Sequence, residues 1–153
     1  MTTAITLIVI AALAGLDQLI KFLVLTNIKP QNAVPVIDGI IRFRYVENTG
    51  AAFSMLSDNT WILSIVTGVL IIGIIVYLIL GKSSSKLETV SLVMIASGGI
   101  GNLIDRIFRG FVVDFIEYLF MDWGVFNFAD ILVTVGAVLL VISVLFVKGE
   151  RNE

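Results

Sequence analysis

Residues 61–80 read WILSIVTGVLIIGIIVYLIL, a stretch without a single charged side chain. A helix needs about 20 apolar residues to cross the hydrocarbon core of a bilayer, which is roughly 30 Å thick. Uninterrupted apolar runs of this length are typical of transmembrane helices rather than of buried helices in globular domains. This stretch therefore predicts a transmembrane helix and decides the fold class.

Three further apolar segments complete the pattern, at residues 4–25, 87–104 and 126–147. The 153-residue chain is 58% hydrophobic and only 14% charged, whereas soluble domains carry about 25% charged residues. The length fits one domain. The sequence predicts a mainly α-helical polytopic membrane protein, a single domain of residues 1–153 with four transmembrane helices and both termini on the same side.

The sequence contains no cysteine and no histidine. A disulfide framework, a thiolate nucleophile and a histidine general base are therefore excluded, and so are the commonest zinc ligands. Acid–base chemistry would have to come from carboxylates, lysine or tyrosine. The net charge of −2 without a basic block gives no indication of a nucleic-acid partner.

Two long loops, at about 26–60 and 105–125, lie on the side opposite the termini. Asp38-Gly39 is a hairpin-turn dipeptide, and the alternation of apolar and polar residues over 41–46 is typical of a strand. Residues 111–116 are also β-prone, so a small sheet is expected beside the helices. Residues 51–56 are predicted to form a short interfacial helix.

Basic residues give a weak orientation signal. The predicted terminal side carries four of them in short segments, whereas the other side carries five in longer loops. The first set is Lys82, Lys86, Lys148 and Arg151, and the second is Lys29, Arg42, Arg44, Arg106 and Arg109. The higher density in short segments favours cytoplasmic termini and extracytoplasmic loops.

Polar residues, which are costly in a membrane and are retained where they pair or function, gather near one predicted membrane face. They are Asn102, Asp105 and Arg106 at the exit of the third span, Asp114 in the loop, and Asn127 and Asp130 at the entry of the fourth. Residues three or four apart share a helix face, which groups Asn127 with Asp130. The same rule predicts an Asp17–Lys21 pair in the first span. Helix ends on one side that carry two candidate carboxylates and several amides predict a site there.

The chain resembles the bacterial lipoprotein signal peptidases in five elements that occur in the expected order. They are Asp17-Gln18-Leu19-Ile20-Lys21, Asn48-Thr49-Gly50-Ala51-Ala52-Phe53, Gly98-Gly99-Ile100-Gly101-Asn102-Leu103-Ile104-Asp105-Arg106, Val113-Asp114-Phe115-Ile116 and Phe126-Asn127-Phe128-Ala129-Asp130. Each motif alone is weak, but five in register over residues 15–135 are a specific match.

The resemblance implies a peptidase of the bacterial cytoplasmic membrane that removes the signal peptide of prolipoproteins before a diacylglyceryl-modified cysteine. It places the two catalytic aspartates at Asp114 and Asp130. The substrate-binding or supporting positions that it implies are Asn48, Gly50, Asn102, Asp105, Arg106, Asn127, Asp17 and Lys21. Its expected partners are lipid-modified precursors and membrane lipid, the protein is expected to act as a monomer near the extracytoplasmic face, and neither a metal nor a cofactor is expected.

Other interpretations of these residues stay open at the level of sequence. Asp105-Arg106 fits a structural clasp at a helix exit, and Gly98, Gly99 and Gly101 fit a face for close helix packing. A Ser–Lys protease would use Lys21 as base, with Ser54 or Ser97 as nucleophile. A small proton-coupled transporter would also hold carboxylates in four spans, but it would place them near mid-membrane.

Overall fold

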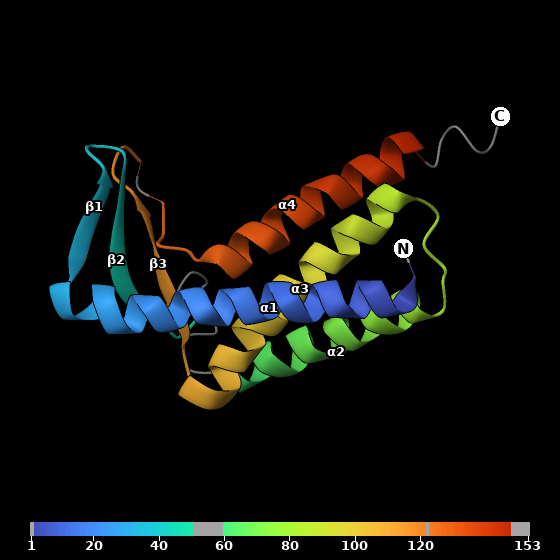
Figure 1. The fold of residues 1–153 in the computed structure, drawn as a ribbon, viewed down its shortest axis with the longest axis horizontal. Coiled ribbons are helices and arrows are strands. Elements are labelled where there is room, and N and C mark those ends of the chain that lie inside the picture. The colour runs from blue at the N-terminus through green and yellow to red at the C-terminus, as the bar shows by residue number, and fades with distance from the viewer. Residues whose placement is uncertain (1, 51–59, 122, 148–153) are drawn as a thin grey trace.

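The computed structural model describes residues 2–50, 60–121 and 123–147. Its elements in chain order are α1 (Thr3–Leu23), η1 (Val24–Ile28), η2 (Lys29–Gln31), β1 (Ala33–Ile37), β2 (Ile41–Asn48), α2 (Thr60–Ile79), α3 (Lys86–Arg109), β3 (Val112–Tyr118), α4 (Phe128–Ile142) and η4 (Ser143–Val147). In the described residues four long helices run side by side, and the three strands lie at one end of them (Figure 1).

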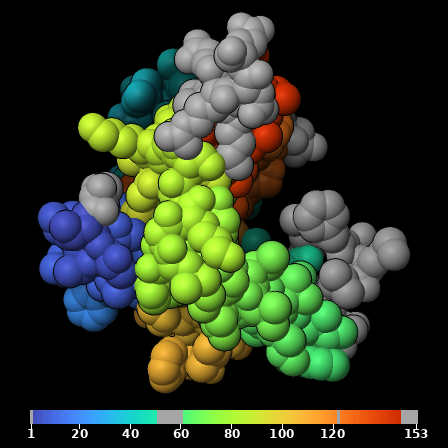
Figure 2. Space-filling view, turned by 90° about the vertical axis from the view of Figure 1, so that its right-hand side faces the viewer, coloured from blue at the N-terminus to red at the C-terminus, as the bar shows by residue number. Residues whose placement is uncertain are grey.

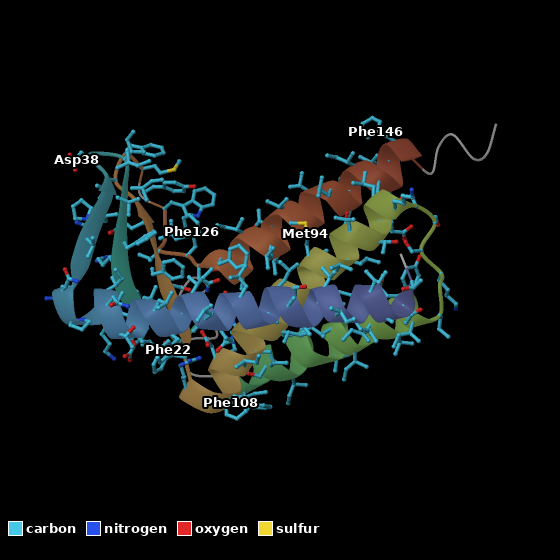
Figure 3. The ribbon with its side chains drawn as sticks, in the orientation of Figure 1. Phe22, Asp38, Met94, Phe108, Phe126 and Phe146 are labelled. Atoms are coloured by element: carbon cyan, nitrogen blue, oxygen red, sulfur yellow. The ribbon has the colours of Figure 1, made fainter. Side chains whose placement is uncertain are left out.

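The four helices are long and apolar enough to cross a membrane, as the sequence predicts. The segments that qualify are Thr3–Gln31, Trp61–Ile79, Lys86–Arg109 and Phe128–Phe146. Large apolar side chains point outward from the helices, among them Phe108 and Phe146 (Figure 3), which are 79% and 68% exposed. Side chains of this kind suit a lipid environment, so the prediction of a mainly helical membrane protein is confirmed.

The third helix is longer than the sequence suggested. We expected the span to end at residue 104, but α3 continues through Asp105 and Arg106 to Arg109 and ends at Gly110, whose φ of +80° favours glycine. The charges did not mark an exit from the membrane helix because Asp105 is fully buried against other elements. The final turns of α3 are therefore part of the site described below.

Glycines let α3 approach its neighbours closely. A Cβ at Gly98 would collide with the backbone carbonyl oxygen of Ala129 on α4, and a Cβ at Gly101 would collide with the carboxylate of Asp17 on α1. Small residues at helix interfaces are the usual means of close packing in membranes. The close-packing interpretation of these glycines is confirmed.

The strands form an antiparallel sheet in the order β1-β2-β3. The β1–β2 hairpin turns at Gly39, whose φ is +71°, as the Asp38-Gly39 dipeptide predicts. In the β2–β3 pair, Val46 lies opposite Asp114. Val113 and Phe115 pack with Val24 at the end of the first helix, so the sheet is fixed to the bundle and its β3 strand faces the helix ends.

The two ends of the bundle differ. The start of α1, the end of η4 and the turn between α2 and α3 lie at one end, which faces the viewer in Figure 2, and the sheet lies at the other end (Figure 1). The first and last described helical segments therefore have their outer ends on the same side, as four spans require. The interfacial helix predicted for residues 51–56 falls outside the described residues.

Candidate active site

Asp114 of β3 and Asp130 of α4 line the same groove at the sheet end of the bundle. The groove has a volume of about 640 Å³ and is also lined by Asn48, Gly50 and Arg106. Volumes of 300–1,000 Å³ are typical of ligand sites in proteins. The structure thus brings together the two aspartates that sequence reasoning selected.

Asp114 is a nearly buried carboxyl group in a polar setting. It is 1% exposed, and its two oxygens accept hydrogen bonds from the Asn127 side-chain amide (2.6 Å) and from the Asn48 side-chain amide (2.8 Å). Burial raises the pKa of Asp114 to about 6, and the negative charge of Asp130 acts in the same direction. Asp114 therefore keeps its proton to a higher pH than an exposed aspartate does.

Asp130 is held by the start of its own helix. Asn127 caps α4 and accepts a hydrogen bond of 2.9 Å from the backbone N–H of Asp130, while the backbone N–H of Asn127 donates to the Asp130 carboxylate at 3.0 Å. This reciprocal pattern is a capping box. The other Asp130 oxygen accepts from the Asn102 side-chain amide at 2.8 Å. These bonds hold both carboxylate oxygens in defined positions.

Asn127 links the two aspartates. Its side-chain amide donates to Asp114 at 2.6 Å and to the side-chain oxygen of Asn102 at 3.1 Å, and its side-chain oxygen caps Asp130. Asn127 is fully buried, and its side chain makes three hydrogen bonds, to Asp114, to Asn102 and to the backbone N–H of Asp130. It therefore orients both carboxyl groups at once without adding charge.

A buried ion cluster of α1 and α3 residues supports this arrangement. Lys21, Asp17 and Asp105 have fully buried side chains, and the Lys21 ammonium lies 2.9 Å from the Asp17 carboxylate and 3.1 Å from the Asp105 carboxylate. Lys21 also donates to the side-chain oxygen of Asn102 at 2.9 Å. The Asp17–Lys21 pair predicted from the sequence is thus present, and Asp105 completes it.

The cluster also holds the backbone next to each candidate aspartate. Asp105 accepts a hydrogen bond of 2.9 Å from the N–H of Val113, and Asp17 accepts one of 3.1 Å from the N–H of Ala129. Val113 precedes Asp114 and Ala129 precedes Asp130 in the chain. One lysine with two carboxylates therefore sets the relative position of the strand and the helix that carry the pair.

Asp105 and Arg106 do not form the clasp that their adjacency suggested. Asp105 pairs with Lys21 and Arg109, which lies one turn further along α3, while Arg106 lines the groove beside the two aspartates. Neighbouring residues point to different sides of a helix, whereas residues four apart share a side. The spacing of Asp105 and Arg109 was the signal for the correct pair.

Two further polar residues belong to the cluster and were missed as site residues. Gln18 donates to Asp105 at 3.1 Å and to the carbonyl oxygen of Gly101 at 3.0 Å, and it accepts from Arg109 at 3.0 Å. Gln18 adjoins Asp17, and Arg109 follows Asp105 by one turn. Their positions on already polar helix faces were the available signal.

Asn48 and Gly50 form the loop side of the groove. The Asn48 side-chain oxygen accepts from the backbone N–H of Gly50 at 2.8 Å, while its amide donates to Asp114. Gly50 has a φ of +97°, a conformation that favours glycine. The pair therefore closes a small turn that aims the Asn48 amide at the carboxylate.

The sequence as a whole matches a known protein family. The profile of the family described as "Signal peptidase (SPase) II" matches residues 9–146. The chain belongs to the signal peptidase II family. Proteins named lipoprotein signal peptidase are similar to it: one from Streptococcus thermophilus (strain CNRZ 1066) is 40% identical over 135 residues, 88% of each chain. One from Clostridioides difficile (strain 630) is 40% identical over 146 residues, 95% of this chain and 98% of the relative.

Solved structures of the same architecture extend the comparison to three dimensions. A structure described as a bacterial membrane enzyme at 2.3 Å superposes with a TM-score of 0.85 and 28% identity, covering 98% of this chain and 92% of the other. A second structure of that description, at 1.9 Å, gives a TM-score of 0.83 at the same identity. The protein is a multi-pass bacterial membrane protein of a peptidase family that removes signal peptides from prolipoproteins.

Proposed function

We propose that the chain is an aspartic endopeptidase that cleaves prolipoproteins immediately before a diacylglyceryl-modified cysteine. Asp114 and Asp130 activate the water, and neither a metal nor a cofactor takes part. The observation that carries the proposal is the joint placement of these two carboxyl groups in one groove, with Asn127 bonded to both. The groove opens among the ends of membrane helices, where a membrane-anchored precursor presents its cleavage site.

The proposed reaction uses the two protonation states of the pair. Asp114 and Asp130 line one groove, and the charge of Asp130 opposes ionisation of Asp114, so Asp114 keeps its proton up to a pH of about 6. The ionised aspartate takes a proton from water, and the water oxygen bonds to the scissile carbonyl carbon. The protonated aspartate hydrogen-bonds the carbonyl oxygen and stabilises its developing charge. The C–N bond then breaks as a proton passes to the amine of the departing cysteine.

The supporting residues have matching roles in this scheme. Asn127 and Asn102 hold the carboxylates, and Asn48 holds Asp114 from the loop side. Arg106, which also lines the groove, supplies a positive charge for a substrate carbonyl. Lys21 and its two carboxylates position the backbone without touching the substrate.

The groove also suits an apolar peptide. Beyond the aspartates it is lined by Leu63 of α2 and by Ile131 and Val135 of α4, and Tyr118 and Trp123 stand at its sheet end. A signal peptide has an apolar central region. We propose that this region lies between α2 and α4, with the cleavage site at the two aspartates.

The two rival functions fit the contacts less well. In a Ser–Lys protease Lys21 would be a free base, but it is bound to two carboxylates and an amide oxygen, and the Ser97 hydroxyl donates to the carbonyl of Val93. Ser54 lies outside the described residues. A transporter would place its carboxylates near mid-membrane, whereas Asp114 and Asp130 lie at the sheet end of the bundle.

The orientation and the oligomeric state belong to the same proposal. The termini lie in the cytoplasm, the sheet and the two aspartates lie at the extracytoplasmic face, and the protein acts as a monomer. Because the chain has no cysteine, a single Ser84→Cys or Asp38→Cys variant can be labelled in intact cells with an impermeant maleimide. Labelling of Asp38→Cys alone is expected, and labelling of Ser84→Cys alone would reverse the orientation.

The decisive experiment removes each carboxyl group in turn. Asp114→Asn and Asp130→Asn keep the side-chain size and lose the ionisable proton, and Asp38→Asn is the control because Asn-Gly also suits the hairpin turn. Cleavage of a diacylglyceryl-modified precursor by purified protein is followed by gel shift. We expect the control to cleave like the wild type and both site variants to lose cleavage while keeping their thermal unfolding transition. Near-normal cleavage by either site variant would remove that aspartate from the mechanism.

A further inference from the structure

A second groove lies between α2 and α3 at the same end of the bundle. It has a volume of about 510 Å³ and is lined by Trp61, Ser64, Ile65 and Gly68 of α2 and by Leu103, Arg106 and Ile107 of α3. Apart from Ser64 and Arg106 its lining is apolar. It lies within the membrane-spanning parts of both helices, beside the end of α3 where Phe108 points outward (Figure 3).

Arg106 connects this groove to the candidate active site. Arg106 lines both grooves, whereas the two share none of their other lining residues. The remainder of the second groove runs along α2 from Trp61 to Gly68, away from the aspartates. Among the described residues it is thus a mainly apolar groove, and its one charged lining residue, Arg106, adjoins the candidate active site.

We propose that the α2–α3 groove binds one acyl chain of the substrate's diacylglyceryl group, with Arg106 at the glyceryl ester. The inference rests on the proposed function and names its lipid subsite. The substrate has matching chemistry, since its acyl chains are apolar, its ester carbonyls accept hydrogen bonds, and both are joined to the cysteine at the cleavage site. A long chain in this groove with its ester near Arg106 would leave the scissile bond beside Asp114 and Asp130.

The subsite acts by orientation rather than by hydrophobic attraction. An acyl chain already lies in lipid, and lipid tails are as apolar as the groove walls, so its transfer gains little hydrophobic free energy. The groove instead fixes the chain and, through the glyceryl link, the cysteine. Correct placement of reacting groups is worth large rate factors, since a misplacement of about 1 Å can cost roughly a hundredfold in rate.

Gly68 provides a direct test because it faces the groove with room to spare. A Cβ at Gly68 would contact only Leu103, at 3.9 Å, and a Cβ at Gly73 on the same helix would contact nothing within 4 Å. Gly68→Leu therefore fills the groove, and Gly73→Leu is the matched control outside it. The probes are two synthetic precursors that differ only in carrying dipalmitoylglyceryl or dihexanoylglyceryl cysteine.

We expect Gly68→Leu to lower kcat/KM for the dipalmitoyl precursor by about tenfold or more and to leave the dihexanoyl precursor within about twofold of wild type. Gly73→Leu should change neither. Ile65→Trp, which adds bulk to an exposed side chain of the same groove, should reproduce the chain-length effect if Gly68→Leu does not fold.

An unchanged ratio of the two precursors in both groove variants would overturn the subsite, whether both rates fall together or neither falls, and would show that the groove holds bulk lipid only. That result leaves the proposed function standing as long as the wild type cuts both precursors. Failure of the wild type to cut, or cleavage by Asp114→Asn, would instead overturn the proposed function itself.

Discussion

The ammonium group of Lys21 lies 2.9 Å from the carboxylate of Asp17, and both side chains are fully buried in the first helix. Each partner reaches a different part of the fold, since Asp17 holds the backbone of α4 at Ala129 while Lys21 reaches Asp105 and Asn102 on α3. The pair therefore joins α1, α3 and α4 next to the candidate site, and its loss is expected to lower the free energy of unfolding.

Lys21→Met is expected to destabilise the protein strongly. The variant leaves Asp17 buried without its cation and leaves Asp105 with Arg109 alone. Breaking a buried pair in this way costs about 3–5 kcal/mol. Thermal unfolding in detergent measures the change. Lys29→Met is the matched control, because Lys29 pairs with Glu47 at an exposed position and such pairs contribute little. Equal unfolding temperatures for the two variants would show that the buried cluster contributes no stability.

Asn127→Ala should lower kcat much more than it changes KM. It removes a helix cap, which costs about 0.5–2 kcal/mol of stability, and it removes the amide donor to the Asp114 carboxyl group. The resulting misplacement of Asp114 implies roughly a hundredfold loss of rate. Ser85→Ala removes the cap of α3, where Ser85 accepts from Glu88 at 3.0 Å, far from the aspartates. This control should lose similar stability and keep its kcat. A parallel loss of kcat in both variants would mean that stability, not positioning, was the cause.

The pH dependence of kcat/KM should show a descending limb with a midpoint at or above about 6. The pKa of Asp114 is raised to about 6, so its protonated form is present below that pH and is lost as the pH rises through it. If the singly protonated pair is the working form, kcat/KM falls on the alkaline side. Initial rates of precursor cleavage across pH 5–9 measure it.

Asn48→Ala should move this limb to higher pH. The Asn48 amide donates to Asp114 and favours its ionised form, so removing the donor raises the pKa further. The direction of each pH effect tests the assignment. A wild-type kcat/KM that rises with pH through 6 would make ionised Asp114 the working form, and an Asn48→Ala limb at lower pH would contradict the assigned contact.

Gly98→Ala should destabilise the bundle by about 1–3 kcal/mol, which is typical of overpacking. The added methyl group would meet the backbone oxygen of Ala129, and a backbone atom between two packed helices has no room to withdraw. Gly15→Ala on α1 is the control, since a Cβ there meets nothing within 4 Å and alanine is the better helix former. The unfolding temperature should fall for the first variant only, and an equal effect would argue against close contact of α3 with α4.

Much of the fold could be predicted because the decisive signals are local. The uncharged run of 61–80 needs no partner to indicate a span, and Asp38-Gly39 followed by alternating residues predicts the hairpin without knowledge of the rest. The end of α3 could not be predicted in this way. Asp105 and Arg109 look like residues leaving the membrane, and only contact with Lys21 and Gln18 of α1 explains why the helix continues.

The residues of the candidate site could be predicted, but the hydrogen bonds and ion pairs between them could not. The polar helix ends, together with the family resemblance, selected Asp114, Asp130 and Asn127, and the structure brings them together, while their catalytic roles stay predictions. That Asp105 bonds to the backbone of Val113, or that Gln18 joins the cluster, depends on how α1 crosses α3. No spacing within one helix carries that information.

The hydrogen bond from the N–H of Ala129 to Asp17 ties the first membrane helix to the last, and this has a consequence for biogenesis. Because synthesis starts at the N-terminus, α1 to α3 are made before α4. In that interval Lys21 already has Asp17 and Asp105, but Asn127 and Asp130 are missing. Under the proposed mechanism such a chain cannot cleave its substrate, because Asp130, the second proposed catalytic aspartate, comes only with α4.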